Sequence, residues 1–294
     1  MNLEFQPVSL DLLETYERYL AECPVKASDY TFANLWGWAD VHGLEVAFDN
    51  GLAWIRRTVP EIRLRAPVGA WKGRDWNEDL AVFAPGTTFE RVPEDLVGMW
   101  TKAGVAARIE ESEGQWDYLY DTTELIELSG RKFHKKKNHL NQFFRKYEFT
   151  YVPIVPETAE LALGLQADWC LWRDCEDEAT LAAENRCIHR VLTNWDSLPG
   201  LVGGVLRVEG QIAAYTVGEP LDETTFLVHF EKGCPGFRGI YQAVNQQFLK
   251  HEAADYPLVN REQDLGDEGL RKAKMSYHPV DFLKKSIVVL GRES

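Results

Sequence analysis

The chain has 294 residues, 45% of them hydrophobic, which is enough for two ordinary domains. Its net charge of −14 argues against DNA binding and other indiscriminate nucleic-acid binding, because such binding needs broad neutralisation of phosphates. No apolar run reaches 18 residues, and the first residues lack the charged-then-apolar pattern of a signal peptide. We therefore expect a cytoplasmic protein without a transmembrane segment.

The cysteines predict neither a disulfide framework nor a zinc site. They are five, an odd number, and no two are spaced as C-x-x-C. Cys187 and His189 look like a metal pair, but they lie two residues apart in a helical pattern and so point in different directions. We expect reduced, mostly buried thiols, no structural metal and no bound cofactor.

The first half of the chain reads as a mixed layer of helices and strands. A helix is expected over 9–21, strands over 44–48, 52–57 and 62–66, a helix from Pro93 to about Lys102 and a strand over 105–109. Asn50-Gly51 predicts a hairpin turn between the first two strands. The polar residues form no recognisable catalytic cluster, so a scaffold role is favoured for this half.

The second half is more regular. Expected strands are 149–154, 200–208, 211–219, 224–231, 257–261 and 285–290, and expected helices are 157–174, 178–195, 239–253 and 267–275. The succession β-α-α-β-β-β-α-β-α-β resembles an N-acetyltransferase-like fold of the GNAT type. We thus expect an α/β (α+β) protein with an N-terminal GNAT-like scaffold domain (1–128), a linking helix (129–148) and a C-terminal GNAT-like domain (149–294).

A basic segment lies between the two halves. Its apolar residues Phe133, Leu140, Phe143, Phe144 and Tyr147 fall on one helical stripe. The segment holds seven basic residues and no acid: Arg131, Lys132, Lys135, Lys136, Lys137, Arg145 and Lys146. A solvated surface helix would explain a generic charge run. Without acidic neighbours for i,i+4 pairing, however, these residues repel one another, which favours a phosphate-bearing partner such as tRNA or an anionic lipid headgroup.

A glycine-rich turn follows the strand that ends near Glu231. Gly233, Gly236 and Gly239 let the backbone come close to a ligand, and Arg238 with the amides of the next helix could hold an anion. An ordinary loop that needs positive φ explains the glycines equally well.

The densest polar cluster follows the strand over 257–261. Strand alternation sends Asn260 and Glu262 to one face and Arg261 and Gln263 to the other, at the carboxyl end of a central strand, where sites of α/β proteins collect. Surface ion pairs at i,i+4 account for the following helix, but not for five consecutive polar side chains at a strand end, so a functional role is favoured.

Four segments carry a resemblance to a known family: 116–120, 129–147, His229-Phe230-Glu231-Lys232 and 260–279. Together they resemble the C-terminal domain family of phosphatidylglycerol lysyltransferases. The resemblance implies a pair of acetyltransferase-like folds joined by a basic helix, with aminoacyl-tRNA as donor and a lipid hydroxyl as acceptor. Lipid-modifying members carry a large membrane portion that this sequence lacks, so the acceptor of this chain stays open.

On this basis we expect an amine or hydroxyl to attack an activated carbonyl while a carboxylate removes its proton. The candidate catalytic residues are Glu231, Glu262, Asp264 and Tyr277. The candidate donor-binding residues are Gly233, Gly236, Arg238, Gly239, Asn260, Arg261, Arg271, Lys272 and Lys274, and the basic segment would bind a tRNA backbone or anionic lipid. Two alternatives remain: an acyl-coenzyme A N-acyltransferase, and a module that binds tRNA, a nucleotide or lipid without turnover.

Overall fold

The computed structural model describes residues 3–291, which form two compact units. The first unit contains residues up to 117, together with 263–271 and 282 onward; the second contains 118–262 and 272–281. The chain therefore returns to its first unit twice. The expected boundaries were 128 and 148, whereas the residues of the basic segment lie inside the second unit.

The first unit is a sheet covered by short helices. Its helices are α1 (Leu13–Glu22), α2 (Phe32–Gly37), α3 (Ala39–His42), α4 (Trp76–Leu80) and α5 (Glu94–Lys102). Its strands are β1 (Gln6–Pro7), β2 (Leu44–Asp49), β3 (Leu52–Arg57), β4 (Arg63–Arg65), β5 (Val68–Gly69), β6 (Thr88–Pro93), β7 (Ala107–Glu111) and β15 (Lys285–Leu290). The sheet order is β1-β2-β3-β4-β6-β15-β7, with β5 on β3.

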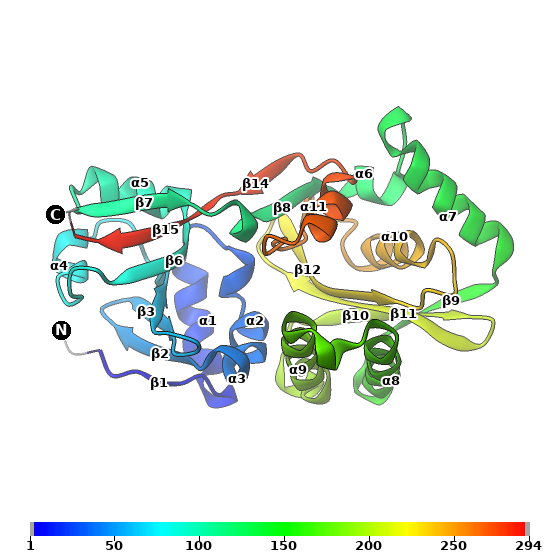
Figure 1. Ribbon diagram of the computed structural model, residues 1–294, viewed down its shortest axis with the longest axis horizontal. Coiled ribbons are helices and arrows are strands. Elements are labelled where there is room, and N and C mark those ends of the chain that lie inside the picture. Colours follow the sequence, from blue (N-terminus) through cyan, green and yellow to red (C-terminus); the bar gives the residue numbers. More distant parts are fainter. Residues whose placement is uncertain (1–2, 292–294) are drawn as a thin grey trace. The chain divides into compact units, whose positions relative to one another are not determined.

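The last strand is the main departure from the expected succession. We expected 285–290 to complete the C-terminal domain, but β15 lies between β6 and β7, antiparallel to both. In Figure 1 the red β15 accordingly runs beside the cyan-green β7. Hydropathy predicts that a strand exists but not its partners, because both sheets offer an apolar surface to it.

Aromatic residues fill the core of the first unit. Phe89 of β6 stacks edge-on with Phe83 and with Trp100 of α5, at ring distances of 5.3 and 5.2 Å. Trp100 in turn contacts Trp76 of α4. These tryptophans explain why a unit with such short helices buries a continuous core.

The second unit has a larger sheet and longer helices. Its helices are α6 (Thr122–Glu127), α7 (His134–Lys146), α8 (Pro156–Arg173), α9 (Ala179–Thr193) and α10 (Ile240–Glu252); α11 (Glu268–Met275) is divided between the units. Its strands are β8 (Asp117–Asp121), β9 (Phe149–Pro153), β10 (Val202–Val208), β11 (Gln211–Pro220), β12 (Thr225–Gly233) and β13 (Leu258–Asn260), with β14 (Asp281–Leu283) at the edge. The sheet order is β14-β8-β13-β12-β11-β10-β9.

Helices cover both faces of this sheet. Figure 1 shows α8 and α9 side by side on one face and α10 on the other. Tyr215 of β11 donates to Gln166 of α8, whereas Phe226 of β12 packs on Phe248 of α10 with ring centroids 5.6 Å apart. The two faces of the sheet therefore present different side chains to different helices.

The predicted hairpin turn at Asn50-Gly51 is present, and a second hairpin turn joins β10 and β11. Asn50 and Gly51, between β2 and β3, both have positive φ (46° and 74°). Glu209 and Gly210, between β10 and β11, do as well (51° and 84°). Two consecutive left-handed residues give the turn twist that matches paired strands.

The basic segment folds as a short 3-10 turn (Arg131–Phe133) followed by α7. Phe133, Leu140 and Phe143 are buried as expected. Phe144 is 37% exposed and stacks on Phe149 at the surface. Lys132 has an acidic partner at another spacing: its Nζ lies 2.6 Å from Glu124 of α6, eight residues earlier in the chain. The expectation concerned i,i+4 pairing only and did not cover this spacing.

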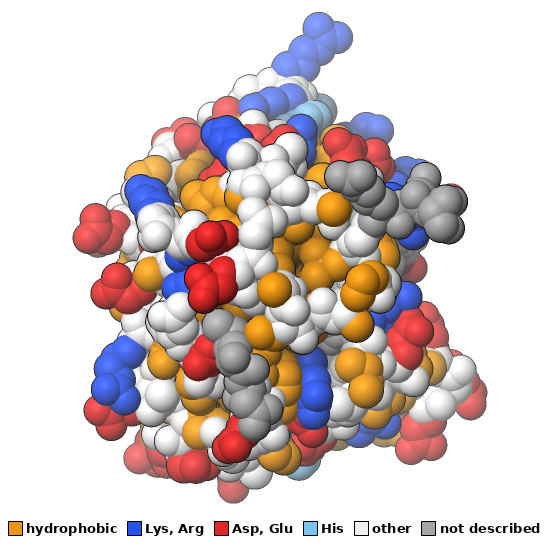
Figure 2. Space-filling view, turned by 90° about the vertical axis from the view of Figure 1, so that its left-hand side faces the viewer, with side chains coloured by type: hydrophobic (Ala, Val, Ile, Leu, Met, Phe, Trp, Pro, Cys, Tyr) orange, Lys and Arg blue, Asp and Glu red, His pale blue; other side chains and the backbone are white. Residues whose placement is uncertain are grey.

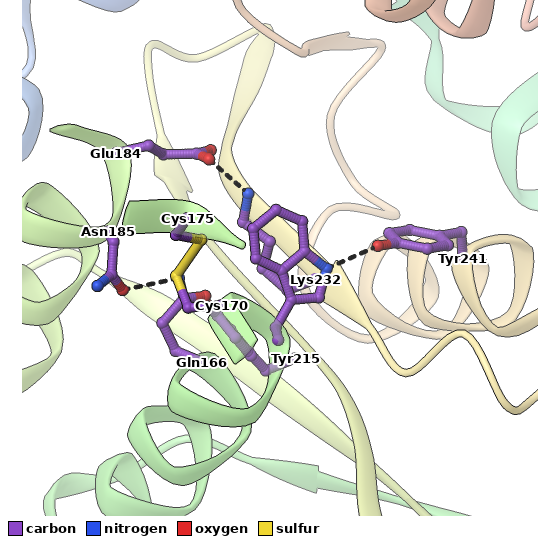
Figure 3. Close-up of a disulfide and its surroundings, with 9 residues drawn as sticks. Gln166, Cys170, Cys175, Glu184, Asn185, Tyr215, Lys232 and Tyr241 are labelled. Atoms are coloured by element: carbon purple, nitrogen blue, oxygen red, sulfur yellow. Dashed lines mark hydrogen bonds and ion pairs between the residues drawn. A yellow bond between two sulfur atoms is a disulfide. The ribbon is translucent and has the colours of Figure 1, made fainter. Parts of the chain in front are cut away.

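The cysteine prediction is also wrong in one respect. Cys170, in the last turn of α8, and Cys175 form a disulfide with their Cα atoms 5.0 Å apart. Asp174 ends the helix in a left-handed conformation (φ 50°) and so turns the chain back. Gln166 holds this turn by bonding Asn185 of α9 (2.9 Å), as Figure 3 shows. The described Cys23, Cys187 and Cys234 are free thiols.

Charges are dispersed on the surface drawn in Figure 2, where acidic and basic side chains are interspersed among apolar and neutral ones. Within residues 3–291, the helices are all too short or too polar to cross a membrane.

Candidate functional site

The candidate site of the second unit lies where β12 and β13 separate. The two strands pair in parallel only from Thr225–Leu258 to Leu227–Asn260, after which β12 continues to Gly233 paired with β11. β13 stops at Asn260, and Glu262 then takes a left-handed conformation (φ 56°) that turns the chain away. Beyond this point the two segments are no longer paired with each other.

On its other side, β12 pairs with β11, and this pairing contains a register shift. Val217 of β11 pairs with Phe230, but the next residue, Gly218, pairs with Val228. His229 is therefore the extra residue of a β-bulge, a feature that bends a strand and re-aims its side chains.

Glu231 is the first catalytic candidate, and it is held from two elements. Its carboxylate accepts hydrogen bonds from Asn245 Nδ2 of α10 (3.0 Å) and from Arg261 Nη2 (3.2 Å). The side chains of Glu231 and Arg261 are only 11% and 14% exposed. The sequence predicted each of these two residues at the end of a strand, and the structure brings them into contact.

Tyr277 lies against the same arginine. The Arg261 guanidinium carbon is 5.1 Å from the centre of the Tyr277 ring, and Gln242 Nε2 of α10 donates to the phenol oxygen (3.1 Å). Burial raises the pKa of Tyr277, and Glu231 adds to this, whereas Arg261 and the Gln242 hydrogen bond oppose it. The phenol is therefore protonated at neutral pH, and because its oxygen accepts from Gln242, its own proton remains available for donation.

The basic helix reaches this cluster through one residue. Lys136 Nζ of α7 lies 4.2 Å from the centre of the Tyr277 ring, on which it makes a cation–π contact. Burial and the nearby Arg261 lower the pKa of Lys136, while Glu231 opposes them. Of the seven basic residues of the segment, Lys136 thus belongs to the Glu231 cluster, which we define as Glu231, Arg261, Tyr277, Lys136, Asn245 and Gln242.

A buried histidine supports the neighbouring part of β12. His229 bonds Glu219 through Nε2 (2.8 Å) and Glu262 through Nδ1 (2.9 Å), and its side chain is 1% exposed. Burial by itself lowers the pKa of His229, but the two carboxylates outweigh it and raise the pKa to about 9. The imidazolium form therefore prevails at neutral pH, and Glu262 acts in this structure as its partner.

Other predicted residues lie elsewhere. Asp264 and Arg271 belong to the first unit, where Arg271 Nε donates to Asp264 (2.7 Å). Lys272 is exposed, and Lys274 donates to the backbone oxygen of Arg261. The Asn260 side chain is buried and accepts a hydrogen bond from the Glu262 amide (2.8 Å). The strand ends at Asn260, so the side chains of 261–263 do not alternate between two faces as expected.

The glycine-rich turn packs closely against α7. Gly239 has φ 91°, and a Cβ there would lie 2.5 Å from the backbone oxygen of His139. At Gly233 it would lie 3.0 Å from Ile240. Packing alone thus requires glycine at 239, and Arg238 on the same turn is exposed. The remaining basic residues Arg131, Lys135, Arg145 and Lys146 are exposed, while Lys137 donates to the backbone oxygen of Glu127.

Sequence reasoning missed Asn245, Gln242, Glu219 and His229 as site residues. Asn245 and Gln242 are three residues apart on α10, so they share a helix face, and this polar pair in an otherwise apolar face was the available signal.

The chain matches the family model described as "Phosphatidylglycerol lysyltransferase, C-terminal" over residues 21–289. It belongs to this family. The fold and the family thus identify the chain as a member of a transferase family, as the sequence indicated.

Three other proteins are similar to this chain. A conserved protein of unknown function from Bacteroides thetaiotaomicron VPI-5482 is 30% identical, with a TM-score of 0.88 over 99% of this chain and 100% of that one. L-PGS from Bacillus licheniformis is 15% identical, with a TM-score of 0.66 over 100% of this chain and 95% of that one. The protein MYCGA3080 of Mycoplasmoides gallisepticum is 26% identical over 206 residues, covering 66% of this chain but only 63% of that protein.

A tandem GNAT protein from the clavulanic acid biosynthesis pathway shares the fold, with a TM-score of 0.50 at 15% identity over the full length of both chains. The expected tandem GNAT-like α/β fold is confirmed.

Proposed function

We propose that the second unit transfers an aminoacyl group from an aminoacyl-tRNA to an amine or hydroxyl acceptor. The observation that carries the proposal is the Glu231 cluster, which gathers a carboxylate, a guanidinium, a protonated phenol and a lysine of the basic helix where β12 and β13 separate. Membership of the lysyltransferase family supports the reaction class.

The reaction replaces an ester bond by an amide or a new ester. The acceptor nitrogen or oxygen attacks the aminoacyl carbonyl, and its proton passes to Glu231, whose oxygens retain lone pairs besides those used by Asn245 and Arg261. The bond from the carbonyl to the ribose oxygen breaks, and that oxygen takes the Tyr277 proton. Glu231 then reprotonates Tyr277, so protons balance over one turnover.

The positive groups of the cluster stabilise the negative charge that develops on the carbonyl oxygen. Arg261 stays charged, since Glu231, Tyr120 and Tyr277 together raise its pKa against the effect of burial. Lys136 supplies a second cation from α7. Fixed charges in a partly dehydrated site reorganise little during reaction and so favour the transition state.

The exposed basic residues of the helix supply the donor contact. Arg131, Lys135 and Arg145 are exposed and would bind the tRNA backbone, with the same charges able to approach an anionic lipid surface. We place the reaction in the cytoplasm, where aminoacyl-tRNA is formed.

An acyl-coenzyme A N-acyltransferase is the second candidate, favoured by the GNAT-like fold and by the glycine-rich turn before α10. Coenzyme A needs that turn and Arg238 but not the exposed face of α7. A non-catalytic binding module would use the same groups without turnover.

Donor binding separates these possibilities. Binding of aminoacyl-tRNA and of acetyl-coenzyme A is measured at two salt concentrations for the wild type and for an Arg131, Lys135, Arg145→Gln variant. A Lys72, Lys102, Lys250→Gln variant is the matched control, because it removes the same charge at exposed positions outside the basic segment.

If three phosphate contacts are lost, the slope of log K against log salt for tRNA becomes shallower by about 2 to 3 in the first variant and stays unchanged in the control. Coenzyme A binding that is indifferent to both variants, without tRNA binding, would support the second candidate instead. If neither aminoacyl-tRNA nor acetyl-coenzyme A binds the wild type, both transferase candidates are refuted.

A further inference from the structure

Three arginines lie on three neighbouring strands of the sheet in the first unit. Arg57 ends β3, Arg65 ends β4, and Arg91 lies in the neighbouring β6, where it has a left-handed conformation (φ 57°). β4 pairs with β3 on one side and with β6 on the other, and Arg65 lies opposite Glu90. Since neighbouring strands are only about 4.8 Å apart, long side chains on them share one space.

His42 joins this arginine cluster, defined here as Arg57, Arg65, Arg91 and His42. The backbone oxygen of His42 accepts from the amide of Thr58, directly after Arg57 (3.1 Å). Burial and then Arg65, Arg91 and Arg57 lower the pKa of His42 to about 4. The imidazole is therefore neutral at pH 7, and its environment is strongly positive.

Most of the cationic side chains here have a carboxylate partner. Arg57 Nε lies 2.9 Å from Glu90, and Arg91 pairs with Asp29. The fully buried Lys285 pairs with Asp29 and with Asp117.

Arg65 is the exception. It is only 4% exposed, yet within residues 3–291 its Nε has no hydrogen-bond partner and no ion pair is formed by its guanidinium. Burial, together with Arg91, lowers its pKa to about 10, because these effects outweigh Asp29 and Glu90. Arg57 and Arg63 share Glu61, at 3.9 and 2.6 Å. The region therefore holds five cations against four carboxylates: Arg57, Arg63, Arg65, Arg91 and Lys285 against Asp29, Glu61, Glu90 and Asp117.

One uncompensated buried charge is costly, because a guanidinium loses most of its hydration without gaining a partner. A bound anion removes this cost. The planar donors of a guanidinium match the paired oxygens of a carboxylate or phosphate group. Arg91 (19% exposed side chain) and His42 are only partly covered, so the cluster borders solvent at these two residues.

We propose that the arginine cluster of the first unit is a binding site for a small oxyanion, a carboxylate or phosphate group, with Arg65 as its principal ligand. One negative charge balances the excess of one cation, and the neutral His42 ring offers a further hydrogen bond. The site is independent of the Glu231 cluster and of the transfer reaction.

The test compares thermal stability in sodium phosphate, in sodium acetate and in sodium chloride at equal ionic strength. We expect phosphate, acetate or both to raise the melting temperature of the wild type saturably, and the more effective ion identifies the group that is bound. No saturable effect of either ion beyond that of chloride would overturn the proposal.

Two variants locate the effect. Arg65→Gln removes the unpaired charge, so in chloride it should be at least as stable as the wild type, while its affinity for the oxyanion falls at least tenfold. Arg63→Gln, two residues earlier on β4, removes a guanidinium that lies 2.6 Å from the largely exposed Glu61, and it should bind the oxyanion normally. If Arg65→Gln were destabilised equally in every buffer, Arg65 would have only a structural role and the proposal would fail.

A measurement on the wild type alone guards against a variant that does not fold. The NMR resonances of the His42 ring should shift saturably with the oxyanion, because the three arginines act electrostatically on this ring and the His42 backbone is bonded to Thr58, directly after Arg57. Resonances that stay unchanged through the titration would contradict binding at this cluster.

Discussion

Replacement of Glu231 by glutamine tests both the stability and the chemistry assigned to the second unit. Glutamine keeps an oxygen that accepts from Asn245 but removes the negative charge 3.2 Å from Arg261. Since both side chains are less than 15% exposed, Arg261 then keeps a largely buried charge without its carboxylate. With the hydrogen bond retained, we expect a loss of about 2 kcal/mol in the free energy of unfolding, or about 4 to 8 °C in melting temperature.

The same variant should lose about 10²- to 10⁴-fold in transfer rate, the usual contribution of a positioned general base. Chemical denaturation and single-turnover transfer are measured on one preparation. Glu252→Gln is the control: Glu252 accepts from Tyr151 (3.0 Å) at the far end of α10 and should keep its activity. Full activity in folded Glu231→Gln would refute the role of Glu231 as base, and an unchanged stability would refute its buried pair with Arg261.

Three further predictions concern single side chains. Tyr277→Phe keeps the ring that contacts Lys136 but removes the phenol proton. The transfer rate at a saturating concentration of aminoacyl-tRNA should therefore fall about 10²-fold or more, while the control Tyr151→Phe remains active. Equal rates for Tyr277→Phe and the wild type would exclude proton donation by Tyr277. His229→Gln should be less stable than the wild type at pH 6. Because the pKa of about 9 exceeds the unfolded value near 6.5, this difference in stability should shrink as pH rises from 6.5 through 9. A stability difference that grows with pH would contradict a charged His229. A double Cys170→Ser, Cys175→Ser variant should lose about 2 kcal/mol of stability and become insensitive to reductant, whereas a wild type that is already insensitive would show that the disulfide is absent.

The sequence predicts local elements of this protein well where their signals are local. Asn50-Gly51 determines a hairpin turn by its own backbone preferences, and hydropathy alternation locates 285–290 as a strand to the residue. What it does not predict is the sheet to which that strand belongs, because hydropathy does not specify the neighbouring strands; tertiary packing places β15 between β6 and β7.

The candidate site was partly predictable for the same reason. Glu231 and Arg261 stand at the ends of neighbouring parallel strands, so the general rule for α/β sites brings them together. The contact of Glu231 with Asn245 depends on how α10 packs on the sheet, which no sequence spacing reveals. The disulfide was not predicted from the sequence, because its two cysteines lie five residues apart across a helix end, a spacing that matches no metal or redox motif.

The central claim is turnover at the Glu231 cluster. The most direct measurement incubates the protein with tRNA charged with labelled amino acids and with a small-molecule and lipid extract, and follows the transfer of label from tRNA to a new product. The account predicts transfer by the wild type and by Glu252→Gln, and little by Glu231→Gln. Label that stays on the tRNA with the wild type, or that leaves it equally fast with Glu231→Gln, would contradict the account.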